Sequence, residues 1–213
     1  MGTDRRSFLK YALAGYAAAN IAAANAAAQN VPPYAKGARK PAHVDYKRIA
    51  TEEAWGPPEM FKMYADLIEN GALTDPGFVS MWGRFLRNVP LRAQLEDIGE
   101  KRIHDMDISG LDKMVLSLTA PGVQVFDAAT ANSLSTSTND QLAEAIKKHP
   151  DRLAGLAAVA PQDPKAAAKE MERGIKKLGL NGVIINSHTN GEYLDDSKFW
   201  EIFEAAQALD AAI

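Results

Sequence analysis

Cysteine is absent from the 213-residue sequence, and histidine occurs only four times. Without cysteine the chain has no disulfide framework, no thiolate metal site and no cysteine nucleophile. A bound metal ion would therefore be held by Glu, Asp and His side chains, and these hard and borderline ligands suit Mn, Mg or Zn.

An excess of positive charge is also lacking, since the formal net charge is −3. No basic stripe is present to meet phosphates, which argues against a nucleic-acid partner. No Gly-x-Gly-x-x-Gly follows the first apolar run of the main domain, so a dinucleotide-binding fold loses its main support. With 46% hydrophobic and 24% charged residues, the composition is that of an ordinary globular protein.

The first 28 residues resemble an export signal. The run Arg5-Arg6-Ser7-Phe8-Leu9-Lys10 is similar to a twin-arginine motif, and the Ala-rich stretch after it ends in the small residues Ala26-Ala27-Ala28. We therefore expect a signal peptide at 1–28 and export to the periplasm. The alternative is a cytoplasmic protein in which this stretch is an amphipathic helix.

A linker is expected at residues 29–47, which contain Pro32 and Pro33. A stable membrane anchor is not expected, because Asn20 and Asn25 interrupt the only long apolar run. A membrane-spanning helix needs about 20 predominantly apolar residues.

From residue 48, short apolar runs alternate with amphipathic helical stretches. The runs are continuous, as in strands that are buried on both faces. We expect strands at 48–55, 113–119, 152–160, 181–188 and 211–213, and helices at 92–108, 141–148, 165–178 and 197–209. This alternation indicates parallel βα units, and the predicted fold class is α/β, a (β/α)8 TIM-barrel type.

The length does not suffice for eight such units. A complete barrel takes about 250 residues, and residues 56–112 form one long excursion between the first two strands. An open half barrel would leave strand edges unpaired. We therefore expect 48–213 to be the N-terminal part of a barrel, truncated after the first four to five βα units.

Active sites of such barrels lie at the carboxyl ends of the strands. Glu52 is the candidate metal ligand at the end of the first strand. Alternation sends Glu52 and Glu53 in opposite directions, and Glu52 shares its direction with the small Ala50 and Ala54. The alternative for Glu52 is a salt-bridged strand end.

The chain from about residue 48 onward resembles the amidohydrolase-related metal-dependent decarboxylases, which act on γ-resorcylate, 2,3-dihydroxybenzoate, aminocarboxymuconate semialdehyde or 5-carboxyvanillate. The resemblance rests on four segments in order: IATEEAW, RIHDMDISGLDKMVLSLTAPGVQ, HPDRLAGLAAVAPQDP and LGLNGVIINSHTNGEYLDD. The first strand reads Glu-Glu-Ala, as in the 5-carboxyvanillate decarboxylases, where most relatives read Glu-Glu-His.

The resemblance implies a (β/α)8 barrel that removes a carboxylate from a hydroxylated aromatic acid. It implies a divalent metal (Mn, Zn or Mg), no organic cofactor, and a homo-oligomer at full length. The metal would clamp the hydroxyl and carboxylate oxygens of the substrate while the ring carbon is protonated.

The resemblance also assigns ligands. Glu52 corresponds to the first-strand ligand, and Ala54 stands where most relatives have a second ligand, a His. This departure favours Mn or Mg over Zn. The remaining ligands of the family, a His and an Asp, would follow Ile213, so no catalytic residue is assigned within the chain.

Four residues are candidates for substrate binding. Arg92 would hold the carboxylate with its planar guanidinium, and its alternative is an exposed arginine in the first turn of a helix. Trp82 and Phe85 would form an aromatic wall, or else pack on the barrel. His188, at the end of the fourth strand, would bond substrate or support the metal, or else be structural.

Two further interpretations remain open. A metal-dependent hydrolase of the same superfamily would cleave a lactone or an amide by activating water. An inactive barrel fragment would bind no metal tightly, because one clear ligand does not hold a metal ion.

A reporter fused to residues 1–30 tests the export signal. We expect the fusion to reach the periplasm and the Arg5-Arg6→Lys-Lys variant to stay inside the cell, because the pathway reads the arginine pair. Cell fractionation measures both. Unchanged export of the variant would contradict the twin-arginine assignment.

Overall fold

The structure is a computed structural model that describes residues 45–213. The predicted signal peptide at 1–28 and most of the predicted linker at 29–47 lie outside the described residues. The described residues belong to one compact unit. Within that range, no helix is long and apolar enough to cross a bilayer.

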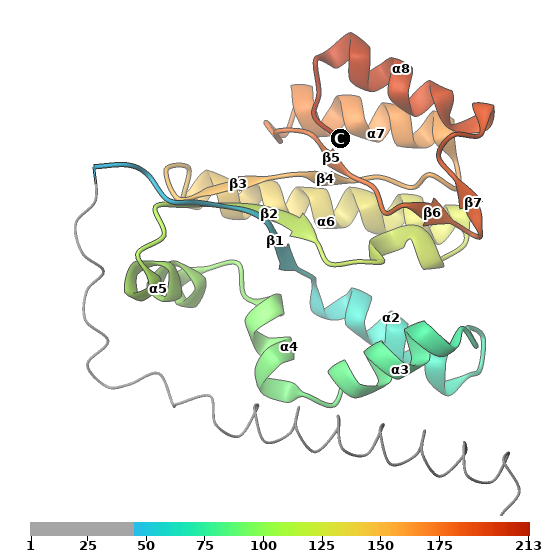
Figure 1. Cartoon of the computed structure of the whole chain (residues 1–213), viewed down its shortest axis with the longest axis horizontal. Coiled ribbons are helices and arrows are strands. Elements are labelled where there is room, and N and C mark those ends of the chain that lie inside the picture. Colours follow the sequence, from blue (N-terminus) through green and yellow to red (C-terminus); the bar gives the residue numbers. More distant parts are fainter. Residues whose placement is uncertain (1–44) are drawn as a thin grey trace, which may run out of the picture. The chain divides into compact units, whose positions relative to one another are not determined.

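Successive parallel strands form the centre of this unit (Figure 1). Their bounds are β1 (Ile49–Trp55), β2 (Lys113–Leu118), β3 (Leu153–Gly155), β4 (Ala157–Ala158) and β5 (Val183–Ile184). β1 pairs with β2, β2 with β3, and β4 with β5, all in parallel. A further parallel bridge joins Gly182 to Ala212, where the sequence predicts a fifth strand. This order of strands is that of consecutive βα units.

The prediction of one unbroken strand at 152–160 is wrong, because the chain is interrupted at Leu156 between β3 and β4. The N–H of Leu156 donates to the carbonyl oxygen of Leu116 on β2, at 2.9 Å. The next N–H, of Ala157, donates to the carbonyl oxygen of Gly182, at 2.8 Å. The strand thus changes its hydrogen-bonded neighbour from one residue to the next.

The prediction of a strand at 181–188 is wrong beyond Ile184, where β5 ends. The N–H of Asn186 donates to Oε1 of Gln124 at 2.7 Å, and its carbonyl oxygen accepts from Nε2 of Gln124 at 3.3 Å. A side chain therefore takes the backbone groups that a neighbouring strand would otherwise bind. His188 belongs instead to β6 (His188–Thr189), which forms an antiparallel hairpin with β7 (Glu192–Tyr193).

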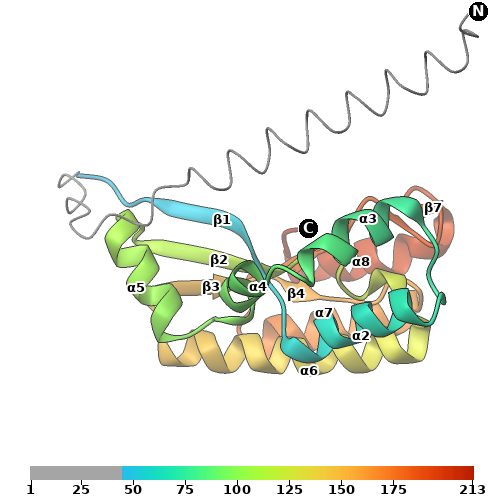
Figure 2. The same ribbon diagram turned by 90° about the horizontal axis from the view of Figure 1, so that it is seen from below.

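Helices connect and cover the strands (Figures 1 and 2). α6 and α7 contact β4, α8 packs on α7, and α2 and α3 lie beyond the carboxyl end of β1. Two 3₁₀ turns, η1 (Gly122–Val125) and η2 (Ser197–Phe199), complete the order. The helices are α2 (Pro58–Glu69), α3 (Pro76–Phe85), α4 (Val89–Glu96), α5 (Glu100–Ser109), α6 (Ala128–Lys148), α7 (Pro164–Lys176) and α8 (Trp200–Leu209).

Polar side chains fix the starts of several helices. The residue before each of α3, α4, α6 and α7 accepts a hydrogen bond from the backbone N–H three residues further on. Such caps satisfy N–H groups that the helix itself leaves free. The capping residues are Asp75, Asn88, Asp127 and Asp163.

Two helix predictions need correction. The segment 92–108 is not one helix but parts of α4 and α5, separated at Asp97–Gly99. Oδ1 of Asp97 accepts from the N–H of Gly99 at 2.7 Å, a local turn that competes with helix formation. The predicted helix at 141–148 is only the end of α6. Its first half is rich in Ser and Thr, which are weak helix formers, and is held by the Asp127 cap and by burial.

Apolar side chains between the strands and α6 form a tightly packed core. Leu116, Leu142 and Leu153 are each at most 1% exposed. Gly155 on β3 allows the close approach of α6, because a Cβ atom there would lie 2.6 Å from Cδ2 of Leu142. This position requires glycine for space rather than for backbone freedom.

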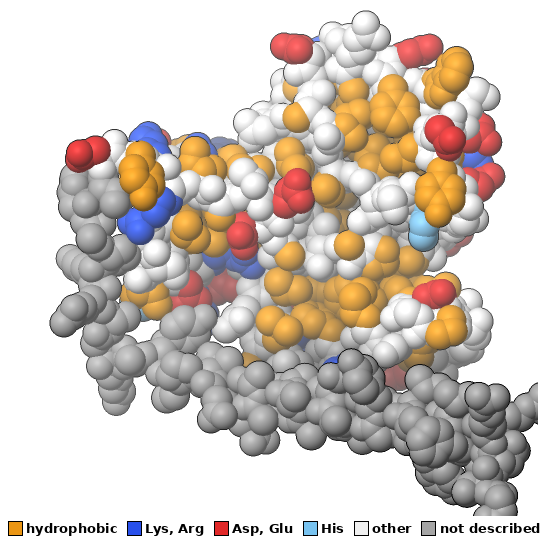
Figure 3. All heavy atoms as spheres, in the orientation of Figure 1, with side chains coloured by type: hydrophobic (Ala, Val, Ile, Leu, Met, Phe, Trp, Pro, Cys, Tyr) orange, Lys and Arg blue, Asp and Glu red, His pale blue; other side chains and the backbone are white. Residues whose placement is uncertain are grey.

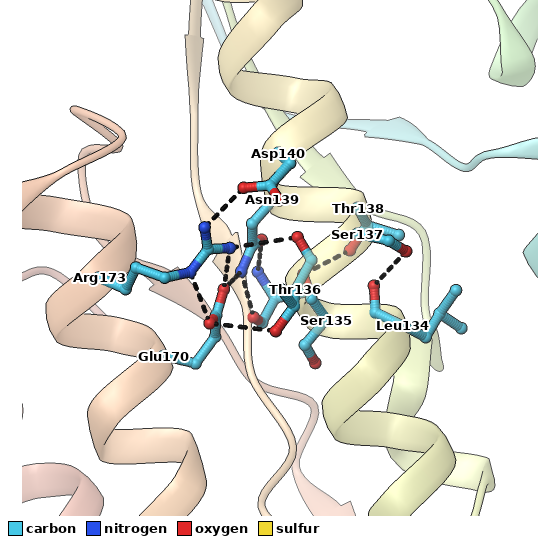
Figure 4. Close-up of polar contacts among 10 residues, drawn as sticks. Leu134, Ser135, Thr136, Ser137, Thr138, Asn139, Asp140, Glu170 and Arg173 are labelled. Atoms are coloured by element: carbon cyan, nitrogen blue, oxygen red, sulfur yellow. Dashed lines mark hydrogen bonds and ion pairs between the residues drawn. The ribbon is translucent and has the colours of Figure 1, made fainter.

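Asn139 of α6 joins the helix to β4 and α7. Its side chain is 1% exposed, and its Oδ1 and Nδ2 bond the N–H and carbonyl oxygen of Ala158 at 2.8 and 2.9 Å. Nδ2 also donates to Glu170 at 2.7 Å, and Arg173 donates to both oxygens of that carboxylate (Figure 4). A single buried amide thus connects one strand and two helices.

Replacing Asn139 by Ala should lower the free energy of unfolding by roughly 2–4 kcal/mol, because buried partners on Ala158 and Glu170 lose their hydrogen bonds. Urea unfolding followed by circular dichroism measures the loss. Asn132→Ala is the control on the same helix, since Asn132 makes a single long bond of 3.4 Å to Asp163, and it should cost less than about 1 kcal/mol. Equal losses would contradict the role of Asn139.

Candidate active site

The carboxyl ends of the strands meet at one rim, which is organised by the loop after β2. The N–H of Thr119 in this loop donates to the carbonyl oxygen of Trp55 at 2.8 Å, and so extends the pairing of β1 and β2 to their ends. The loop continues through a cis peptide bond between Ala120 and Pro121 into η1. In barrels of this type, the catalytic residues lie at such strand ends.

Gln124, in η1, binds the segment that follows β5. Its side chain is 6% exposed, and its Nε2 donates to the Thr189 hydroxyl at 2.6 Å and to the carbonyl oxygen of His188 at 3.1 Å. Its Oε1 accepts from both the backbone and side-chain N–H groups of Asn186, at 2.7 and 2.8 Å. One amide therefore fixes the path of residues 186–189.

Two more side chains hold the same loop. The Tyr64 hydroxyl, from α2, donates to the carbonyl oxygen of Gly122 at 2.6 Å. Nε2 of Gln162, after β4, donates to the carbonyl oxygens of Val123 and Phe126, both at 2.9 Å. Burial is the main cause that raises the pKa of Tyr64, so its hydroxyl keeps its proton and stays a donor.

Glu52, the predicted metal ligand, lies in a β-bulge of β1. Between Ala50 and Glu53, two residues of β1 oppose a single residue of β2. Glu52 has a φ of 58°, in the left-handed region that residues other than glycine rarely adopt. Regular alternation does not hold here, so it does not set the direction of Glu52 as the sequence predicts. Bulges are frequent beside active sites, where they re-aim a side chain.

The described residues do not complete a metal site. Among residues 45–213, no group of three or more His, Asp or Glu side chains could hold a metal ion. Glu52 is exposed and offers a carboxylate, a suitable ligand for Mn or Mg. One carboxylate does not fit a metal by itself, so further ligands are needed for tight binding.

Arg92 borders a cleft of about 720 Å³ between α2, α3 and α4. Phe61 and Leu86 contribute apolar walls to this cleft. Nε of Arg92 lies 3.2 Å from Oε1 of Glu96, and Nη1 donates to the carbonyl oxygen of Leu86 at 3.5 Å. The volume is in the range of small-molecule pockets, which combine apolar walls with a few polar groups.

Trp82 and Phe85 lie one turn apart on α3, inside an aromatic cluster. Their ring centroids are 4.8 Å apart, and the Trp82 ring also lies 4.7 Å from that of Tyr64. Trp82 is 3% exposed, and its indole N–H is buried without a hydrogen-bond partner. This packing is that of a hydrophobic core. A substrate contact by either residue stays a prediction.

His188 is exposed on the hairpin of β6 and β7, where its ring lies edge-on to Tyr193 at 5.9 Å. Its carbonyl oxygen, rather than its imidazole, is held by Gln124. Glu52, Arg92 and His188 thus come from three separate elements, β1, α4 and β6.

A family model described as Amidohydrolase matches residues 80–213. The chain belongs to the amidohydrolase family. The γ-resorcylate decarboxylase of Polaromonas sp. is 41% identical to it over 127 residues, which cover 56% of this chain and 39% of that protein. The γ-resorcylate decarboxylase of Rhodococcus jostii is 35% identical over 149 residues, which cover 70% of this chain and 41% of that protein.

Solved structures of two decarboxylases are also similar to this chain. The 5-carboxyvanillate decarboxylase of Novosphingobium aromaticivorans, complexed with manganese and 4-hydroxy-3-methoxy-5-nitrobenzoic acid, has a TM-score of 0.76 and 45% identity, over 78% of this chain and 49% of that chain. The 2,6-dihydroxybenzoate decarboxylase of Rhizobium has a TM-score of 0.61 and 30% identity, over 78% and 48%.

These likenesses confirm the predicted family and its barrel fold, of which the described strands form a part. This amidohydrolase chain spans 39% to 41% of the length of the two curated relatives. It spans 48% to 49% of the length of the two structures.

Sequence reasoning did not single out Tyr64 or Gln124, although both organise the rim. Gln124 carries a usable signal, because it is a polar residue that follows a buried strand by a few positions, in TAPGVQ. Tyr64 carries none, because it lies in the long excursion 56–112, and only the folded structure brings it to Gly122.

Replacing Gln124 by Leu should release residues 186–189, because their hydrogen bonds to the amide are lost. Hydrogen exchange measured by mass spectrometry should then be at least about tenfold faster in a peptide covering 186–189, since a lost buried bond costs 1–3 kcal/mol. Gln141→Ala is the control, since Gln141 is exposed and bonds only Glu59 on the surface. Unchanged exchange in Gln124→Leu would contradict this role.

Proposed function

We propose that this protein is a divalent-metal-dependent, non-oxidative decarboxylase of a hydroxylated aromatic carboxylic acid. The observation that carries the proposal is the similarity to the manganese-bound 5-carboxyvanillate decarboxylase, at 45% identity and a TM-score of 0.76. A second neighbour, a dihydroxybenzoate decarboxylase of Polaromonas sp., holds manganese and 2-nitroresorcinol, with a TM-score of 0.61. Both proteins bind manganese and no organic cofactor is named for them, which supports a metal as the cofactor here.

We assign to Glu52 the role of first metal ligand. The assignment is supported by the bulge in the middle of β1, which gives Glu52 an unusual backbone conformation. Strained backbone of this kind is concentrated at functional sites, where it costs about 1–3 kcal/mol. When bound, the metal supplies positive charge to the hydroxyl and carboxylate oxygens of the substrate.

Arg92 is assigned to the carboxylate of the substrate, and the cleft beside it supports this role. A guanidinium matches a carboxylate with two parallel N–H donors. Trp82 and Phe85 are assigned to the aromatic wall, because both rings pack against Phe61, which borders the cleft beside Arg92. His188 is assigned to the rim, where its exposed imidazole is available to substrate.

Export and assembly are further parts of the proposal. The arginine pair near the N-terminus supports export by the twin-arginine pathway, with a cytoplasmic location as the alternative. A homo-oligomer is supported by Trp200 and Phe203 on α8, which are 56% and 36% exposed. Figure 3 shows hydrophobic side chains gathered on the surface over this helix. An interface would remove this apolar surface from water.

Metal binding and turnover test the function together. With added Mn²⁺, we expect the protein to release CO2 from 5-carboxyvanillate or γ-resorcylate, and Glu52→Gln to lower Mn²⁺ affinity more than about 100-fold. This exceeds the 10–100-fold cost of losing a residue that only supports a ligand. The electron paramagnetic resonance of free Mn²⁺ gives the affinity. Glu53→Gln, the adjacent acid, is the matched control and should bind Mn²⁺ as the wild type does.

Three outcomes would overturn the proposal. Hydrolysis of a lactone without release of CO2 would identify a hydrolase of the same family. Absence of both turnover and Mn²⁺ binding would identify an inactive barrel fragment. Equal loss of Mn²⁺ affinity in the Glu52 and Glu53 variants would remove Glu52 as the specific ligand.

A further inference from the structure

Arg102, on α5, makes an unusual set of contacts for a charged side chain. Its Nε donates to the carbonyl oxygen of Asp97 at 2.6 Å, and its Nη2 donates to that of Gln94 at 2.8 Å. Both Nη1 and Nη2 donate to the carbonyl oxygen of Ala54 at 3.2 Å. Nη1 also contacts Sδ of Met114 at 3.9 Å. Every N–H of the guanidinium therefore has an acceptor.

The acceptors come from two parts of the chain that the sequence keeps far apart. Ala54 lies in β1, two residues after Glu52, whereas Gln94 and Asp97 lie at the end of α4, the helix that carries Arg92. A backbone hydrogen bond of 3.1 Å, from the N–H of Gly56 to the carbonyl oxygen of Leu95, lies beside these contacts. The guanidinium thus joins β1 to α4 at the rim.

The electrostatics agree with a half-buried guanidinium that holds two segments together. Burial is the main cause that lowers the pKa of Arg102, while the nearby charges of Asp97, Glu53 and Asp105 act in the opposite direction. A guanidinium remains charged under such conditions, and carbonyl oxygens satisfy its N–H groups in place of water. A lysine has three donors on one nitrogen and lacks the planar fork, so it does not reproduce these contacts.

We infer that Arg102 is a positioning residue, which sets the distance and orientation between Glu52 on β1 and Arg92 on α4. It contacts neither the substrate nor the metal in this assignment. It fixes the strand directly after the bulge and, through Gln94 and Asp97, the end of the helix that presents the carboxylate-binding guanidinium. The inference rests on the proposed function only for its effect on catalysis, because the clamp between β1 and α4 is tested separately.

Arg152 offers a matched control. It too binds backbone carbonyl oxygens, those of Asp112 and Leu111, each at 3.0 Å, and it forms an ion pair of 2.7 Å with Asp107. These partners precede β2 and therefore lie at the amino end of the strand rather than at the rim. Arg152→Lys should disturb the structure locally to a similar degree, without reaching Glu52 or Arg92.

The first experiment compares hydrogen exchange in the full chain of Arg102→Lys and Arg152→Lys. Exchange should become at least about tenfold faster at residues 53–57 and 94–99 in Arg102→Lys, and should stay at the wild-type rate there in Arg152→Lys. Unchanged exchange at these residues in Arg102→Lys, or the same change in both variants, would overturn the clamp. If Arg102→Lys does not fold, hydrogen exchange of the wild type is the test. Residues 53–57 and 94–99 should then exchange at one common rate, and clearly different rates would contradict the role of Arg102.

The second experiment measures kcat and KM for decarboxylation of the aromatic acid that the wild type turns over. We expect kcat/KM about 100-fold lower in Arg102→Lys, the effect of a misplacement of about 1 Å, and a change of less than about threefold in Arg152→Lys. Equal kcat/KM values in the two variants would mean that Arg102 has only a structural role, and would overturn the inference. A wild type without decarboxylase activity would instead refute the proposed function, and the exchange experiment would still decide the clamp.

Discussion

The rim of this barrel depends on one constraint: the backbone of the loop after β2 is buried, and its polar groups must find partners. They find them on side chains rather than on another strand. Tyr64 binds the carbonyl oxygen of Gly122, Gln162 binds those of Val123 and Phe126, and Gln124 reaches across to Asn186. An unsatisfied buried polar group costs about 1–3 kcal/mol, so each of these bonds is strongly favoured. The segment that carries each partner is therefore held against the loop. This loop therefore joins the middle of α2 to the segments that follow β4 and β5.

The long excursion between β1 and β2 is tied back to the sheet in the same manner. α4 is a short helix with no fully buried side chain, so packing alone does not fix its position. The hydrogen bonds of Arg102 to Ala54 and Gln94, and that of Gly56 to Leu95, give it a fixed place beside the end of β1. A barrel of parallel strands provides a rigid frame, and side-chain to backbone bonds place the inserted helices on it. This division suits the (β/α)8 fold, which supports many chemistries by variation of its loops.

Comparison of sequence and structure shows where local patterns fail. The apolar runs located β1 and β2 almost to the residue, because strands buried on both faces carry a continuous signal. The same runs overestimated β5, because a side chain, Gln124, replaces the neighbouring strand after Ile184. They also gave no sign of the bulge at Glu52, since a bulge depends on the register with β2 and not on residue type. The ends of α5 and α7 were located within two residues, but the capped starts of α4 and α6, after Asn88 and Asp127, were missed. α2 and α3 were not predicted, because they lie in a segment without strand landmarks.

By itself the sequence determined the family, the parallel βα order and the presence of an acid, Glu52, in the first strand. The family follows from the resemblance of four sequence segments, and the order of strands and helices follows from the spacing of apolar residues. Only the tertiary structure decided the conformation of Glu52, the burial of Trp82, the exposure of His188 and the contacts of Arg102. The conformation of Glu52 depends on the register between β1 and β2, and the contact of Arg102 with Ala54 spans 48 residues. Such contacts form only when the whole chain is folded, so no short stretch of sequence records them.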